Sequence, residues 1–116
     1  MSPRARVFRW DAIPLEKTTE MFARKTIAGA DLALVQSYLK KGTIVPLHAH
    51  GGERLIYVLQ GALRAGLGGD DELTIREGEV LVVAPNTPHQ FEALDDVFLL
   101  TASGSGPAFR RDPPAL

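Results

Sequence analysis

The chain has 116 residues, of which 45% are hydrophobic and 23% are charged. This length and balance are typical of one globular domain rather than a disordered chain. Lys and Arg number 13 against 14 Asp and Glu, so no basic excess exists to neutralise a phosphate backbone. The absence of cysteine excludes disulfides and thiolate chemistry, and no apolar run approaches the ~20 residues of a membrane span. We therefore expect a cytoplasmic protein with no nucleic-acid or membrane partner.

Eleven glycines and eight prolines divide the chain into short runs. We expect an N-terminal arm at residues 1–20 with a short helix within residues 11–22, a barrel domain at residues 21–102, and an irregular tail at residues 103–116. Runs rich in Val, Ile, Leu, Thr and Tyr predict the strands. In chain order these are residues 25–28, 32–39, 43–50, 54–59, 62–67, 72–75, 80–84, 89–94 and 97–101. Short strands separated by turns indicate an all-β sandwich or barrel.

The predicted strand at residues 43–50 carries the first residues of chemical interest. Pro46 lies within it and cannot donate to a ladder, which predicts an edge strand or a bulge. His48 and His50 are two residues apart, so on a strand their side chains share one face with Cβ atoms about 7 Å apart. Imidazole is the commonest metal ligand at neutral pH. The pair alone is equally compatible with two hydrogen-bonded histidines that bind nothing.

The spacing around this pair resembles the first motif of the cupin superfamily, G(x)5HxH(x)3–4E(x)6G. Gly42, His48, His50 and Gly61 stand at its fixed positions, and Arg54 stands where the motif has glutamate.

A second stretch resembles the second cupin motif, G(x)5PxG(x)2H. Gly78 and His89 match it, while Ala84 and Asn86 replace its proline and glycine. Asparagine is the best substitute for glycine where a positive φ is needed, so the turn is expected to survive. The two motifs together account for all three histidines of the chain.

Cupins are small antiparallel β-barrels of the jelly-roll type that bind a divalent metal inside the barrel. The resemblance therefore implies an antiparallel jelly-roll β-barrel with His48, His50 and His89 as metal ligands. The metal would be Fe, Mn, Ni or Zn, and three imidazole ligands do not determine which of these ions is bound. The resemblance also implies a homodimer, with the N-terminal segment around Trp10 at the contact.

Arg54 is the most distinctive departure from the motif. A guanidinium offers only donors and cannot ligate a metal. If it points into the barrel, it would add positive charge beside the ion and grip a carboxylate in bidentate fashion. If it points outward, it would pair with a surface carboxylate instead. Glu53 is the alternative fourth ligand, but only if the strand rotates by one residue.

The phrases around the two motifs resemble the small conserved-barrel cupins of pectin degradation, which open the rings of unsaturated uronates. Arg54 replaces the glutamine that this group places on its metal, and Leu100 and Ala102 stand where it has Asp and Phe. The expected function is a metal-dependent dioxygenase or isomerase that acts on a small anionic organic molecule, with Arg54 as the catalytic residue. The alternatives are a binding or sensor cupin without turnover and an interaction barrel with a vestigial site. The sequence leaves open whether the protein is an enzyme.

Overall fold

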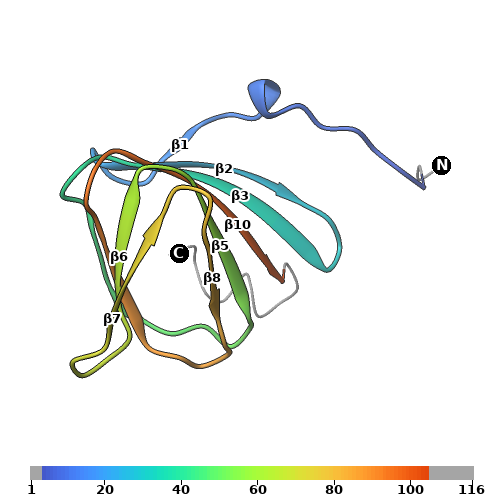
Figure 1. The fold of residues 1–116 in the computed structure, drawn as a ribbon. Coiled ribbons are helices and arrows are strands. Elements are labelled where there is room, and N and C mark those ends of the chain that lie inside the picture. The colour runs from blue at the N-terminus through green and yellow to red at the C-terminus, as the bar shows by residue number, and fades with distance from the viewer. Residues whose placement is uncertain (1–3, 105–116) are drawn as a thin grey trace.

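The computed structural model describes residues 4–104. Within this range the chain forms ten strands in two antiparallel sheets, which confirms the predicted all-β architecture. Figure 1 shows the two sheets facing each other in a jelly roll. The six-stranded sheet has the order β1 (Glu16–Lys17), β2 (Phe22–Ala28), β3 (Leu32–Leu39), β10 (Val97–Gly104), β5 (Arg54–Gln60), β8 (Val80–Val83). The four-stranded sheet has the order β4 (Ile44–His48), β9 (His89–Ala93), β6 (Ala62–Gly66), β7 (Glu72–Arg76).

The hydrophobic core lies between the two sheets. Side chains alternate between the two faces of a strand, and β5 shows this clearly. Ile56 and Val58 are fully buried, whereas Leu55 and Tyr57 between them are exposed. Arg54 has the parity of the buried residues and is itself buried. The alternation therefore points the arginine into the barrel.

The edge position and the bulge predicted from Pro46 are both confirmed. β4 is an edge strand of the four-stranded sheet, and its register against β9 shifts between Val45 and His48. Proline is tolerated there because the missing N–H removes no ladder bond.

The predicted helix within residues 11–22 is wrong. A three-residue 3-10 helix covers Trp10–Ala12, and β1 follows at Glu16–Lys17. Proline disfavours helical backbone in the residue before it, and Ile13, which precedes Pro14, is extended at φ −86° and ψ 128°. No helix in the described part of the chain is long and apolar enough to cross a membrane.

The last strand differs slightly from the prediction. β10 runs to Gly104, two residues beyond residue 102, where the barrel was expected to end. The rest of that tail, residues 105–116, and the first three residues lie outside the described range.

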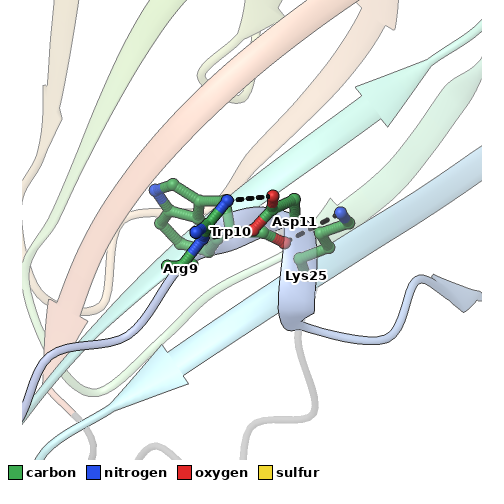
Figure 2. A network of polar contacts seen from close by, with 4 residues as sticks. All are labelled: Arg9, Trp10, Asp11 and Lys25. Carbon is green, nitrogen blue, oxygen red and sulfur yellow. Dashed lines mark hydrogen bonds and ion pairs between the residues drawn. The ribbon is translucent and has the colours of Figure 1, made fainter.

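The N-terminal arm leaves the barrel beside β2, as Figure 1 shows. Figure 2 shows how the arm is held. The Lys25 ammonium on β2 donates a hydrogen bond to the backbone oxygen of Trp10 at 2.9 Å. Arg9 and Asp11 on either side form an exposed ion pair at 2.7 Å. Lys25 alternates with the buried Phe22 and Arg24 on β2, so the arm lies on the outer side of the six-stranded sheet at Trp10.

Candidate metal centre

The three histidines come from two segments that the fold brings together. His48 ends β4 and His89 begins β9, and the two residues are direct cross-strand partners. His50 follows β4 by two residues and is buried. The ring centroids lie 4.2 Å apart for His48 and His89, 4.6 Å for His48 and His50, and 5.2 Å for His50 and His89. One ring nitrogen from each histidine, taken as the ligand atom, lies within 4.8 Å of the other two.

That spacing is close to what a shared ion requires. Two imidazole nitrogens at about 2.1 Å from one ion are at most about 4.2 Å apart. Three nitrogens around one ion at tetrahedral angles are about 3.4 Å apart, so each pair of nitrogens would need to draw together by no more than about 1.4 Å. The three histidines predicted from the sequence therefore lie together, as they must if they are to bind the same ion.

The loop before β9 helps to hold this arrangement. Asn86 has a φ of 60° and is the one residue other than glycine with a positive φ in the described chain. This confirms the expectation that asparagine preserves the turn. The backbone N–H of Asn86 donates to the backbone oxygen of His50 at 2.6 Å. The two histidine-bearing segments are thus tied together through their backbones.

Two of the rings are oriented as metal ligands usually are. His48 Nδ1 lies 2.7 Å from the backbone oxygen of Pro46, and His89 Nδ1 lies 2.7 Å from the backbone oxygen of Thr87. A carbonyl only accepts, so Nδ1 carries the hydrogen in both rings. Their Nε2 atoms then keep a lone pair for an ion, the arrangement that fixes tautomer and orientation at many metal sites.

His50 has the opposite tautomer, with Nδ1 as the acceptor of a hydrogen bond. The Arg54 Nη2 atom lies 3.0 Å from His50 Nδ1. Since a guanidinium only donates, Nδ1 must accept this bond, and a neutral His50 carries its hydrogen on Nε2. Coordination through Nδ1 would displace the arginine, and coordination through Nε2 would turn Nδ1–H toward another donor. Metal binding by His50 and the Arg54 hydrogen bond therefore compete.

The structure decides the two open questions about the fourth position. Arg54 is 5% exposed and faces the histidines rather than the solvent. Glu53 is exposed and does not belong to the cluster of ligand atoms. Among residues 4–104 that cluster contains only the three imidazoles. The site has no carboxylate to offset the charge of a bound cation, and the Arg54 guanidinium beside it adds a further positive charge. Both features favour an anionic ligand.

Sequence reasoning missed the hydroxyl groups beside Arg54. Ser103 on β10 is the direct register partner of Arg54 and is buried. Thr101 is the preceding residue of β10 that faces inward. Neither the Ser103 hydroxyl nor the Thr101 hydroxyl has a hydrogen-bond partner in the described protein. The alternation of Val97, Leu99, Thr101 and Ser103 would have pointed to them. The strand predicted from the sequence ends at residue 101, before Ser103.

The family model described as the cupin domain matches residues 35–101. KdgF from Halomonas sp. is similar at a TM-score of 0.78 and 23% identity, over 86% of this chain and 93% of that one. An RmlC-like cupin from Shewanella frigidimarina has a TM-score of 0.80 and 18% identity, over 92% and 96%. No curated protein matches.

A third similar structure is larger. A variant of oxalate decarboxylase from Bacillus subtilis has a TM-score of 0.76 and 19% identity, over 86% of this chain but only 29% of that one. The same enzyme contains Mn(II) centres. At these identities the three structures establish a shared fold.

Proposed function

Because this chain belongs to the cupin domain family, we propose that it binds one divalent metal ion through His48, His50 and His89 and acts on a small organic anion. The observation that carries the proposal is the convergence of the three imidazoles beside a buried guanidinium. The reaction class that we propose is an isomerisation or a dioxygenation. A bound ion would supply a Lewis acid that polarises a carboxylate or hydroxyl of the ligand.

Arg54 would bind the anion. Its guanidinium is buried, and a buried charge is stable only when paired or hydrogen-bonded. A carboxylate that accepts two N–H donors from this guanidinium would be held in a fixed orientation. The buried hydroxyls of Ser103 and Thr101 lie on the same inner face and would orient the neutral end of the anion.

A second candidate function is a binding or sensor cupin without turnover. One observation favours it, namely that Arg54 holds His50 in the tautomer less suited to a metal. Such competition would weaken the site and make its occupancy responsive to ligand. The two functions differ in whether product forms.

Elemental analysis of protein purified without a histidine tag tests the metal centre. After equilibration with Mn, Fe, Ni or Zn ions, wild-type protein should retain one ion per chain. His48→Ala should weaken metal binding by roughly 10- to 100-fold or more, because it removes one ligand. Gln90→Ala, an exposed neighbour on β9, is the control and should behave as wild type. Equal metal content in wild type and His48→Ala would contradict the proposal.

Incubation of the metal-loaded protein with a panel of small carboxylates then separates enzyme from sensor. Product detected by mass spectrometry, and lost in Arg54→Gln, supports the enzyme. Binding without product across the panel supports the sensor. Oxalate belongs in the panel because a structural neighbour acts on it.

The homodimer and the cytoplasmic location remain part of this proposal. They rest on the sequence, namely the resemblance to small cupins and the absence of cysteine.

A further inference from the structure

The contact between Arg54 and His50 joins the proposed anion site directly to the proposed metal site. The two residues stand at the ends of the segment 50–54, which leads from the four-stranded sheet to the six-stranded sheet. Both side chains are buried, since His50 is 4% and Arg54 5% exposed. The Arg54 Nη2 atom lies 3.0 Å from His50 Nδ1 and donates to it. A ligand that changes the pairing of one side chain therefore changes the pairing of the other.

The hydrogen bond between Arg54 and His50 competes with a cation on His50. A cation that takes the lone pair of Nδ1 replaces the arginine as the partner of that atom. A cation on Nε2 leaves the ring hydrogen on Nδ1, where it faces a guanidinium that offers only donors. In both cases the guanidinium has to turn away from the ring when the cation binds.

The neighbours of Arg54 in the sheet do not neutralise its charge. The cross-strand partners of Arg54 are Ser103 on β10 and Val83 on β8. The Ser103 hydroxyl has no hydrogen-bond partner among residues 4–104, so it can accept an N–H, but it carries no charge. Binding of a cation alone would therefore place two positive charges close together in a buried site, which is unfavourable.

A small carboxylate removes this obstacle. It can accept two N–H donors from the guanidinium, which no longer needs His50 Nδ1 as an acceptor. Its negative charge also offsets the repulsion between the guanidinium and the cation. The carboxylate and the cation thus each provide the condition under which the other binds well.

We infer that the metal and the anion bind to this protein cooperatively, with Arg54 as the positioning residue that couples them. The inference rests on the proposed metal and anion sites, and it adds that each ligand binds weakly until the other is present. By thermodynamic linkage, the anion raises the metal affinity by the same factor by which the metal raises the anion affinity. Coupling between two sites is commonly about 5- to 150-fold, and we expect roughly 10- to 100-fold here.

This coupling differs from the effect of an anion that only coordinates a bound ion. Such an anion also raises the metal affinity, but by a factor that does not depend on Arg54. The coupling inferred here disappears with the arginine, whether or not the protein converts the anion into a product. It makes metal occupancy follow the concentration of the anion.

Calorimetric titration of Mn²⁺ into the full chain tests the coupling. The titration is repeated at constant ionic strength with no added ligand, with acetate, and with acetamide, which is the uncharged analogue of acetate. Acetate should raise the Mn²⁺ affinity of wild-type protein by roughly 10- to 100-fold, after correction for the Mn²⁺ that acetate binds in solution. Acetamide should change this affinity by less than about twofold, because it has no charge to offset that of Arg54.

Two substitutions of Arg54 show whether the arginine carries the effect. Arg54→Gln and Arg54→Leu both remove the guanidinium, and only glutamine supplies an oxygen in its place. In both variants the same acetate concentration should raise the Mn²⁺ affinity by less than about threefold. Each factor is a ratio of two affinities of one variant, so a change in the fold or in basal metal affinity cancels. Arg64→Gln, which breaks an ion pair with Glu92 on the outer face of the other sheet, is the control and should keep the wild-type factor.

Nitrogen NMR of the imidazoles tests the cause. With Zn²⁺ and acetate both bound, His50 Nδ1 should bind the ion or carry the ring hydrogen, so its signal should leave the position it has in protein without metal. An unchanged Nδ1 signal would overturn the inference. So would a coupling factor that Arg54→Gln and Arg54→Leu share with wild type, or one that Arg64→Gln also loses.

The same titrations separate this inference from the proposed function. Wild-type protein that binds Mn²⁺ equally well with and without acetate overturns the coupling and leaves the proposed metal centre standing. Wild-type protein that binds no Mn²⁺ or Zn²⁺ under either condition overturns both.

Discussion

Replacing Arg54 by glutamine should strengthen metal binding and weaken anion binding at the same time. In the structure the guanidinium donates to His50 Nδ1 at 3.0 Å, and His50 cannot coordinate an ion without losing or inverting that bond. Glutamine removes the positive charge and the obligatory donor. It also supplies a carbonyl oxygen at the position where the motif carries an acidic ligand.

The magnitude follows from the hydrogen bond that metal binding must break. A hydrogen bond to a charged group contributes about 1.5–3 kcal/mol, and each 1.4 kcal/mol corresponds to about tenfold in affinity. Metal affinity should therefore rise by roughly 10- to 100-fold in Arg54→Gln. The affinity of metal-loaded protein for a small dicarboxylate should fall by a similar factor. Arg54→Glu should strengthen metal binding further, because a carboxylate offsets the charge of the ion.

Calorimetric titration measures both affinities, and nitrogen NMR of the imidazoles adds a test of the cause. In metal-free wild type, His50 should carry its hydrogen on Nε2, whereas His48 and His89 should carry theirs on Nδ1. Arg64→Gln is the control, since Arg64 pairs with Glu92 on the outer face of the other sheet. Metal and anion affinities in Arg54→Gln within twofold of wild type would refute the reasoning, and so would an Nδ1 hydrogen on His50.

Three further outcomes are expected from the backbone and the surface. Gly61→Ala should cost roughly 3 kcal/mol of unfolding free energy, because its Cβ would lie 2.4 Å from the backbone oxygen of Asp96. Gly42→Ala, with the same φ of 88° and open space, should cost only about 1 kcal/mol, and equal losses in urea melts would contradict this. Asn86→Gly should be as stable as wild type and Asn86→Ala should lose about 1 kcal/mol of unfolding free energy, and equal stability of the two variants in urea melts would contradict this. The hydrogen bond that the Glu16 carboxylate accepts from the Arg24 side chain lowers the pKa of Glu16. The stability that Glu16 contributes is present above its unfolded pKa and disappears as pH falls through the folded one, so Glu16→Gln should cost less than about 1 kcal/mol at pH 7 and nothing in acid.

The sequence by itself determined the fold class and the three histidines. Alternating apolar residues and frequent turn residues are local signals. They predict a strand whatever its position in the fold. Pro46 predicted its edge and bulge for the same reason, because a missing N–H excludes a central ladder position. The family spacing added His89, which no local pattern connects to His48.

Only the tertiary structure decided how those residues act together. The facing of Arg54 depends on which side of β5 the second sheet covers, and its hydrogen bond to His50 depends on how the chain turns after β4. The apolar side chains on the outer face of the six-stranded sheet likewise lie side by side only because the register aligns residues that are far apart in the chain, such as Leu34 and Ala102. Long-range register is set by packing across the whole barrel, and no window of sequence contains it.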